Sequence, residues 1–220
     1  ILQHYYDVST RDKFDDLFGD LYIGQHPTPD RNSYLVLYLN FSGINAELND
    51  YRKGLDEHCG TTIESFCKKY ADLLPPETWE ELHTKNGAVA QLEFLYQVCE
   101  RAGQKMYLFI DEYDHFTNAI LSNPESLRRY TDETHGEGYL RNLFNKVKAG
   151  TYFSIKRCFI TGVNPVTMDD LTSGFNIGTN YSLSSKFNQL MGFTEEEVRE
   201  MLNYYSTNSP FRHTVDELIE

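Results

Sequence analysis

The sequence has no long hydrophobic segment, no closely spaced cysteine pair and no excess of basic residues. No apolar run approaches the roughly 20 residues of a membrane-spanning helix, and no signal region opens the chain, so no membrane partner is predicted. The four cysteines lack metal-ligand spacing and are expected to be reduced, which favours a cytoplasmic protein. The formal charge of -13 argues against direct nucleic-acid binding, because lysine and arginine supply most contacts to phosphate backbones.

Three continuous apolar runs predict buried strands at residues 34–41, 106–110 and 157–163. Segments with helical periodicity lie between them. Strands that alternate with helices and are apolar on both faces are typical of a three-layer α/β domain with a mainly parallel sheet. A chain of 220 residues is long enough for one such domain.

A further helix is predicted near the end of the chain. Thr194 has the position of an N-cap, and Glu197 follows three residues later, which completes a capping box. We expect this helix to continue to about Tyr205.

The second apolar run ends abruptly in two acids, Asp111 and Glu112. Apolar residues followed by Asp-Glu form the Walker B pattern of P-loop ATPases. In that reading Asp111 holds Mg²⁺ through a water, because Mg²⁺ keeps much of its hydration shell. Glu112 orients the water that attacks the γ-phosphate. The alternative is a buried strand that ends in two solvated acids.

Several blocks of the sequence, in their order, resemble the bacterial AAA-ATPase-like family. They are Phe-Ile-Asp-Glu-Tyr-Asp at 109–114, Phe-Ile-Thr-Gly-Val at 159–163, the block at 170–176 and the block at 192–198. The resemblance implies a P-loop NTPase-like fold that uses Mg²⁺ and ATP, with the 106–110 strand between the other two. It also implies a C-terminal nuclease-like effector domain outside this chain, and a helical lid that begins near the end of it.

The resemblance also implies a sensor 1 residue at the end of the third strand, which contacts the γ-phosphate or the attacking water. Thr161 and Asn164 are the candidates. For Thr161 the alternative is a hydroxyl that only caps the strand end. Asn164 precedes Pro165, so it can equally be a turn residue.

No Gly-Lys-Ser or Gly-Lys-Thr occurs in the chain, so the phosphate-binding Walker A loop is missing. We therefore expect a fragment, with an ATPase core that lacks the P-loop strand at 1–190 and the beginning of the lid at 191–220. Natural loss of the P-loop is the alternative. On its own this chain is expected to be inactive and to bind no cofactor, because the acids Asp111, Glu112 and Asp114 would face a polyanion.

Two functions remain open at this stage. The intact protein can be an ATPase that controls an attached effector domain. Alternatively, the fold can serve as a non-catalytic protein-interaction scaffold with a degenerate ATPase site. The presence of both acids favours the ATPase, because a scaffold has no chemical need for Glu112.

Overall fold

The computed structural model describes residues 1–44, 51–115, 138–163, 177–182, 184–187, 192–209 and 211–219. The chain divides into two compact units, Ile1–Ile177 and Gly178–Glu220, and each is described by itself. Both acids of the Walker B pattern lie in the first unit.

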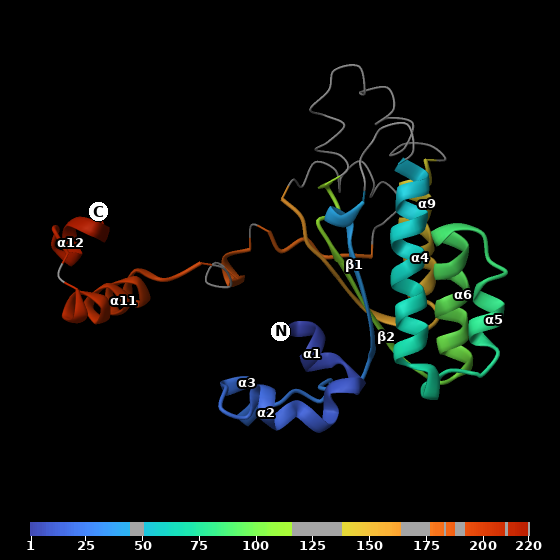
Figure 1. The fold of residues 1–220 in the computed structure, drawn as a ribbon, viewed down its shortest axis with the longest axis horizontal. Helices are drawn as coiled ribbons and strands as arrows, with labels where there is room; N and C mark the ends of the chain where they lie inside the picture. The colour runs from blue at the N-terminus through green and yellow to red at the C-terminus, as the bar shows by residue number, and fades with distance from the viewer. Residues whose placement is uncertain are drawn as a thin grey trace, which may run out of the picture. The chain divides into compact units, whose positions relative to one another are not determined.

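A three-stranded parallel sheet forms the centre of the first unit (Figure 1). Its strands, in spatial order, are β1 (Leu35–Asn40), β2 (Met106–Asp111) and β3 (Ile155–Ile160). The register pairs Asn40 with Asp111 and Ile110 with Ile160, so the carboxyl ends of the strands meet at one edge. The prediction of one parallel sheet with the 106–110 strand in the middle is confirmed.

The third strand begins and ends earlier than the predicted 157–163 segment. It begins earlier because Ile155 is buried and pairs with Met106 across a register shift. It ends earlier because the next residues turn toward the loop after β2, where the amide of Val163 donates to Asp114 Oδ2 at 3.0 Å. Val163 is itself exposed, so its apolar character does not reflect a buried strand position.

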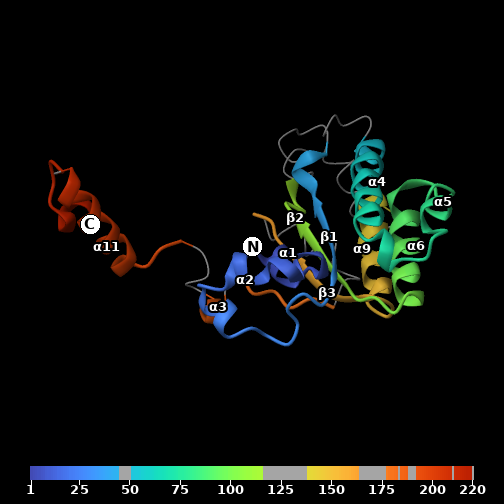
Figure 2. The ribbon, with the colours of Figure 1, turned by 60° about the horizontal axis from the view of Figure 1, so that its bottom comes forward.

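Long helices cover one face of the sheet, and the short N-terminal helices lie near part of the other, as Figures 1 and 2 show. Successive strand residues point to opposite faces because the side-chain period of a strand is two. The face that includes Leu37 and Leu108 packs on three helices, α4 (Tyr51–Lys69), α6 (Gly87–Arg101) and α9 (Tyr139–Gly150). The face that includes Val36 and Phe109 contacts Tyr6 of α1 (Leu2–Tyr6). These three layers confirm the predicted α/β, P-loop-like fold.

Short helices precede β1 and join the larger elements. Before β1 they are α1, η1 (Val8–Lys13), α2 (Phe14–Phe18) and α3 (Tyr22–Gln25). Tyr5, Phe14 and Phe18 of these short helices form a small hydrophobic cluster that is separate from the main core. Shorter elements farther along the first unit are η2 (Phe41–Gly43), η3 (Ala71–Leu73) and α5 (Thr78–Leu82).

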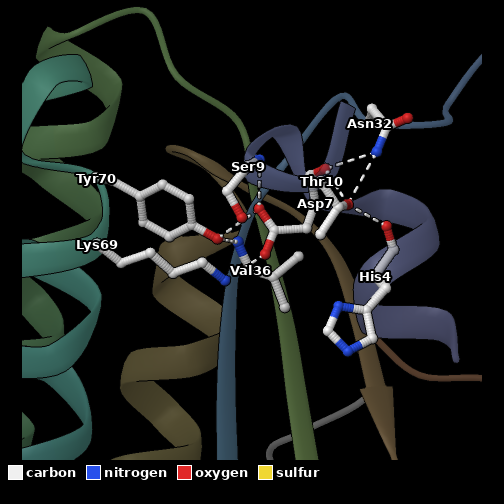
Figure 3. A network of polar contacts seen from close by, with 8 residues as sticks. All are labelled: His4, Asp7, Ser9, Thr10, Asn32, Val36, Lys69 and Tyr70. Carbon is white, nitrogen blue, oxygen red and sulfur yellow. Dashed lines mark hydrogen bonds and ion pairs between the residues drawn. The ribbon is translucent and has the colours of Figure 1, made fainter. Parts of the chain in front are cut away.

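Asp7 is a buried carboxylate at the centre of a polar network (Figure 3). It accepts hydrogen bonds from the Ser9 amide at 2.8 Å and the Tyr70 hydroxyl at 2.9 Å, and it forms an ion pair with Lys69. The Tyr70 hydroxyl in turn accepts a hydrogen bond from the amide of Val36 at 2.9 Å. The network therefore links the N-terminal segment, β1 and the end of α4.

The second unit contains η5 (Ser185–Phe187), α11 (Glu195–Asn208) and α12 (Val215–Ile219). The predicted capping box of α11 is confirmed. The Thr194 hydroxyl accepts from the Glu197 amide at 3.3 Å, and the Glu197 carboxylate accepts from the Thr194 amide at 2.7 Å. Neither these helices nor the others in the described ranges are long and apolar enough to cross a bilayer.

Candidate functional site

Two adjacent acids lie at the carboxyl edge of the central strand. Leu108 to Ile110 are buried, Asp111 is the last residue of β2, and Glu112 is the first residue outside the strand. Asp111 is partly buried, whereas Glu112 is exposed. In open α/β sheets, ligands bind outside this edge. Both acids therefore lie at the carboxyl edge of the sheet, as the sequence predicts.

Hydrogen bonds from three segments hold the Asp111 carboxylate. The Thr161 hydroxyl donates to Oδ1 at 2.5 Å, the Glu112 amide donates to the same oxygen at 3.0 Å, and the Tyr38 hydroxyl donates to Oδ2 at 2.8 Å. The Thr161 bond above all, with those from Tyr38 and Glu112, holds the pKa of Asp111 below its usual range, while burial opposes the shift. Asp111 is therefore an oriented, ionised carboxylate at neutral pH.

Glu112 has a backbone conformation that is uncommon for a residue with a side chain. Its φ is 50°, in the left-handed region, where the Cβ atom meets steric resistance. Its carbonyl accepts a hydrogen bond from the amide of His115 at 3.0 Å, which closes a tight turn directly after β2. The carboxylate is half-exposed and lies 3.8 Å from His115 Nδ1. The turn therefore takes Glu112 out of the strand and leaves its carboxylate open to water.

Asp114 does not join an acidic cluster with Asp111 and Glu112, and that expectation is wrong. Only 1% of Asp114 is exposed, and its Oδ2 accepts a hydrogen bond from the amide of Val163 at 3.0 Å. The turn after β2 directs this side chain inward, so it binds the segment that follows β3. Asp114 therefore holds the segment after β3 against the loop that follows β2.

Gly162 lies against this loop, in a place where a side chain does not fit. A Cβ atom there would come within 2.4 Å of the Tyr113 ring and 2.6 Å of Asp114 Oδ1. Both neighbours are buried and cannot move aside easily. The loops after β2 and β3 therefore pack closely at the edge that carries Asp111 and Glu112.

Gly162→Ala is expected to destabilise the chain by about 1–3 kcal/mol, because overpacking displaces Tyr113 or Asp114. Urea unfolding of the variant and the parent measures this difference in free energy. Gly60→Ala is the matched control, since a Cβ there would meet only the flexible Gln91 side chain, at 3.1 Å, inside α4. Equal stability of Gly162→Ala and the parent would show that the two loops do not pack as described.

The two sensor candidates have different outcomes. Thr161 lies just beyond β3, where its amide donates to the Ile110 carbonyl at 2.9 Å and its hydroxyl donates to Asp111. The hydroxyl thus orients the acid of the neighbouring strand. Asn164 lies outside the described residues.

Tyr38 is a site residue that the sequence did not indicate. It belongs to β1, 73 residues from Asp111 along the chain, and the β1–β2 register is needed to bring the two together. Asn40 is the register partner of Asp111, and Tyr38 lies two residues, about 6.6 Å, behind it on the same face. One sequence signal could have indicated Tyr38. It is a tyrosine two positions before the end of a strand that neighbours a strand ending in an acid.

The donor chemistry of the site fits Mg²⁺. Asp111 offers an ionised oxygen ligand, and Mg²⁺ is commonly held by one or two carboxylates together with waters and substrate phosphates. Within the described part of the chain, no three His, Cys, Asp or Glu side chains converge on a metal position. Asp111 is an ionised carboxylate at this edge that could hold the ion.

A shallow hollow beside β1 is a different feature. It lies between α1, β1 and α4, and its lining includes Gln3, Tyr38 and Lys69 but neither Asp111 nor Glu112. Lys69 is paired with Asp7, so its charge is already matched. Tyr38 is the residue that this hollow shares with the site at the strand edge.

Comparison with known protein families matches residues 1–172 to the family described as "Predicted AAA-ATPase". Among curated proteins, the chain is similar to the "Uncharacterized protein in vnfD 5'region" of Azotobacter chroococcum mcd 1, with 28% identity over 106 residues. That match takes in 48% of this chain and 19% of the relative, so the chain spans only a small part of that protein. No solved structure matches the chain.

Proposed function

Because the chain belongs to the predicted AAA-ATPase family, we propose that its paired acids form the hydrolytic part of an ATP site in the full-length protein. The observation that carries the proposal is the geometry of Asp111 and Glu112. An oriented carboxylate ends the central strand, and an exposed carboxylate follows it on a backbone in the left-handed region. Strained conformations of this kind persist where the surrounding structure enforces them, and they cluster at functional sites.

The two acids have different roles in this proposal. Asp111 would hold hydrated Mg²⁺ through one of the metal's waters, and its lowered pKa suits it to that role because the carboxylate is ionised. Glu112 accepts a hydrogen bond from the attacking water and directs the water oxygen at the γ-phosphorus. The new P–O bond forms as the bond to the leaving ADP oxygen breaks, and the proton of the water leaves toward Glu112. Mg²⁺, when bound, neutralises charge on the phosphates.

Residues after β3 support this edge. Thr161 orients Asp111 through its hydroxyl, and it remains a candidate sensor of the γ-phosphate together with Asn164. A threonine that donates to Asp111 can still accept a hydrogen bond from the attacking water, because its oxygen keeps lone pairs. The sensor role and the orienting role are therefore compatible for Thr161.

The proposal extends to the whole protein, of which these residues would supply the ATPase core and the beginning of the lid. Hydrolysis would control an effector domain outside the chain, and a nuclease-like domain after the lid is the form implied by the family resemblance. The site would act in the cytoplasm. The test of the ATPase step does not depend on the identity of the effector.

Steady-state phosphate release from the full-length protein, with Mg²⁺ and with EDTA, tests the proposed activity. We expect release that requires Mg²⁺ and is lost in Asp111→Asn, because the amide no longer carries the charge that the hydrated metal prefers. A folded protein that releases no phosphate under either condition would contradict the ATPase and favour the interaction scaffold.

The chain of 220 residues by itself is expected to bind Mg·ATP with a dissociation constant weaker than about 1 mM, or roughly -4 kcal/mol. Phosphate contacts in P-loop proteins come from the GxxxxGK[ST] loop, and these residues contain no such sequence. The net charge of -13 also opposes the approach of an anion. Isothermal titration measures the affinity, with the full-length protein as the comparison. Micromolar binding, roughly -8 kcal/mol, would mean that the nucleotide site is elsewhere.

A further inference from the structure

The two oxygens of Asp111 are unequally bonded. Oδ1 accepts from the Thr161 hydroxyl at 2.5 Å and from the Glu112 amide at 3.0 Å, whereas Oδ2 accepts from the Tyr38 hydroxyl at 2.8 Å. A carboxylate oxygen offers about two lone pairs. With the donors of the described residues in place, Oδ1 is fully used and Oδ2 keeps one acceptor position beside the Tyr38 phenol.

Tyr38 is suited to hold Oδ2 in one direction. Its ring is partly buried on the α1 face of the sheet, packed against a cluster formed by Tyr34, Val36 and Phe109. The tyrosine side chain rotates about only two bonds before its rigid ring, so packing of the ring also fixes the position of the hydroxyl oxygen.

We infer that Tyr38 is a positioning residue of the metal site, which aims the remaining acceptor position of Asp111 Oδ2 at the water shell of Mg²⁺. This inference rests on the proposed function. Without the phenol, Asp111 keeps its two bonds at Oδ1, but the direction of Oδ2 is no longer fixed. The loss falls on metal affinity, because the phenol bonds to the carboxylate that faces the metal. Groups that bond to a direct metal ligand typically change metal affinity by about 10–100-fold, and Tyr38, which acts on a carboxylate that contacts the metal through water, is expected at the lower end of that range.

The test compares Tyr38→Phe with the matched variant Tyr34→Phe in the full-length protein. Tyr34 directly precedes β1 and belongs to the cluster against which Tyr38 packs, and the charged side chains that act on its hydroxyl are those of Asp30 and Arg157. One readout is Mn²⁺ binding in the presence of ADP, followed by electron paramagnetic resonance. The other is the Mg²⁺ concentration for half-maximal phosphate release at saturating ATP.

We expect Tyr38→Phe to weaken Mn²⁺ binding and raise the half-saturating Mg²⁺ concentration by about 10-fold, with the maximal rate restored at high Mg²⁺. Tyr34→Phe is expected to stay near the parent in both. Unchanged metal binding in Tyr38→Phe, with an active parent, would overturn the positioning role and leave the proposed function standing. An equal loss in Tyr34→Phe would also overturn it, as an effect of packing. A parent that neither binds Mn²⁺ with ADP nor hydrolyses ATP would refute the proposed function and this inference together.

Discussion

Glu112→Gln in the full-length protein is expected to lower steady-state phosphate release by about 100-fold or more, while Mg·ATP binding stays within a few-fold of the parent. Glutamine has nearly the same shape as glutamate, but its neutral amide cannot accept a proton from the attacking water. It also lacks the negative charge that orients and polarises that water. The Glu112 carboxylate is half-exposed and makes no contribution to the core, so the fold should be unaffected. The loss therefore falls on the chemical step.

Phosphate release and equilibrium nucleotide binding, measured on the same preparations, separate the two effects. Glu80→Gln is a suitable control, because Glu80 is an exposed acid on α5, away from the strand edge. Its turnover should equal that of the parent. Full turnover in Glu112→Gln would remove this residue from the mechanism.

Asp7→Ala is expected to destabilise the chain by about 2–4 kcal/mol, the largest stability effect among the changes considered. The substitution leaves the buried Tyr70 hydroxyl without its acceptor, and it removes the partner of the Ser9 amide and of Lys69. The expected loss is below that of a fully buried ion pair, because 45% of the Lys69 side chain is exposed and water can solvate its charge.

Urea unfolding of Asp7→Ala measures this loss, with Asp12→Ala as the neighbouring control. Asp12 is exposed in η1, so its removal should change the free energy of unfolding by less than about 0.5 kcal/mol. If the two variants were equally stable, the network around Asp7 would not hold the N-terminal segment against β1 and α4.

The strand positions could be predicted because they depend on local composition. A parallel strand covered on both faces is apolar throughout, and residues 106–110 form such a run. The capping box of Thr194 and Glu197 is equally local, since both partners lie within four residues. The end of β3 was missed because Val163 is apolar yet exposed, and its place depends on Asp114 from another loop.

The candidate site was predictable only in part, for the same reason. The position of Asp111 and Glu112 follows from the strand that precedes them. The bonds that Asp111 receives from Tyr38 and Thr161 cross 73 and 50 residues of chain, and they require the register of three strands. The inward direction of Asp114 depends on the turn at Glu112, whose positive φ no composition rule indicates.

The nucleotide that remains on the full-length protein after brief mixing with Mg·ATP tests the role of the paired acids most directly. Protein is separated from free nucleotide, denatured and analysed for ATP and ADP. If Glu112 positions the attacking water, the parent should carry mainly ADP and Glu112→Gln mainly ATP, with similar total amounts of bound nucleotide. ADP on both proteins would show that hydrolysis does not depend on Glu112, and would contradict the assignment of the β2 edge as the hydrolytic site.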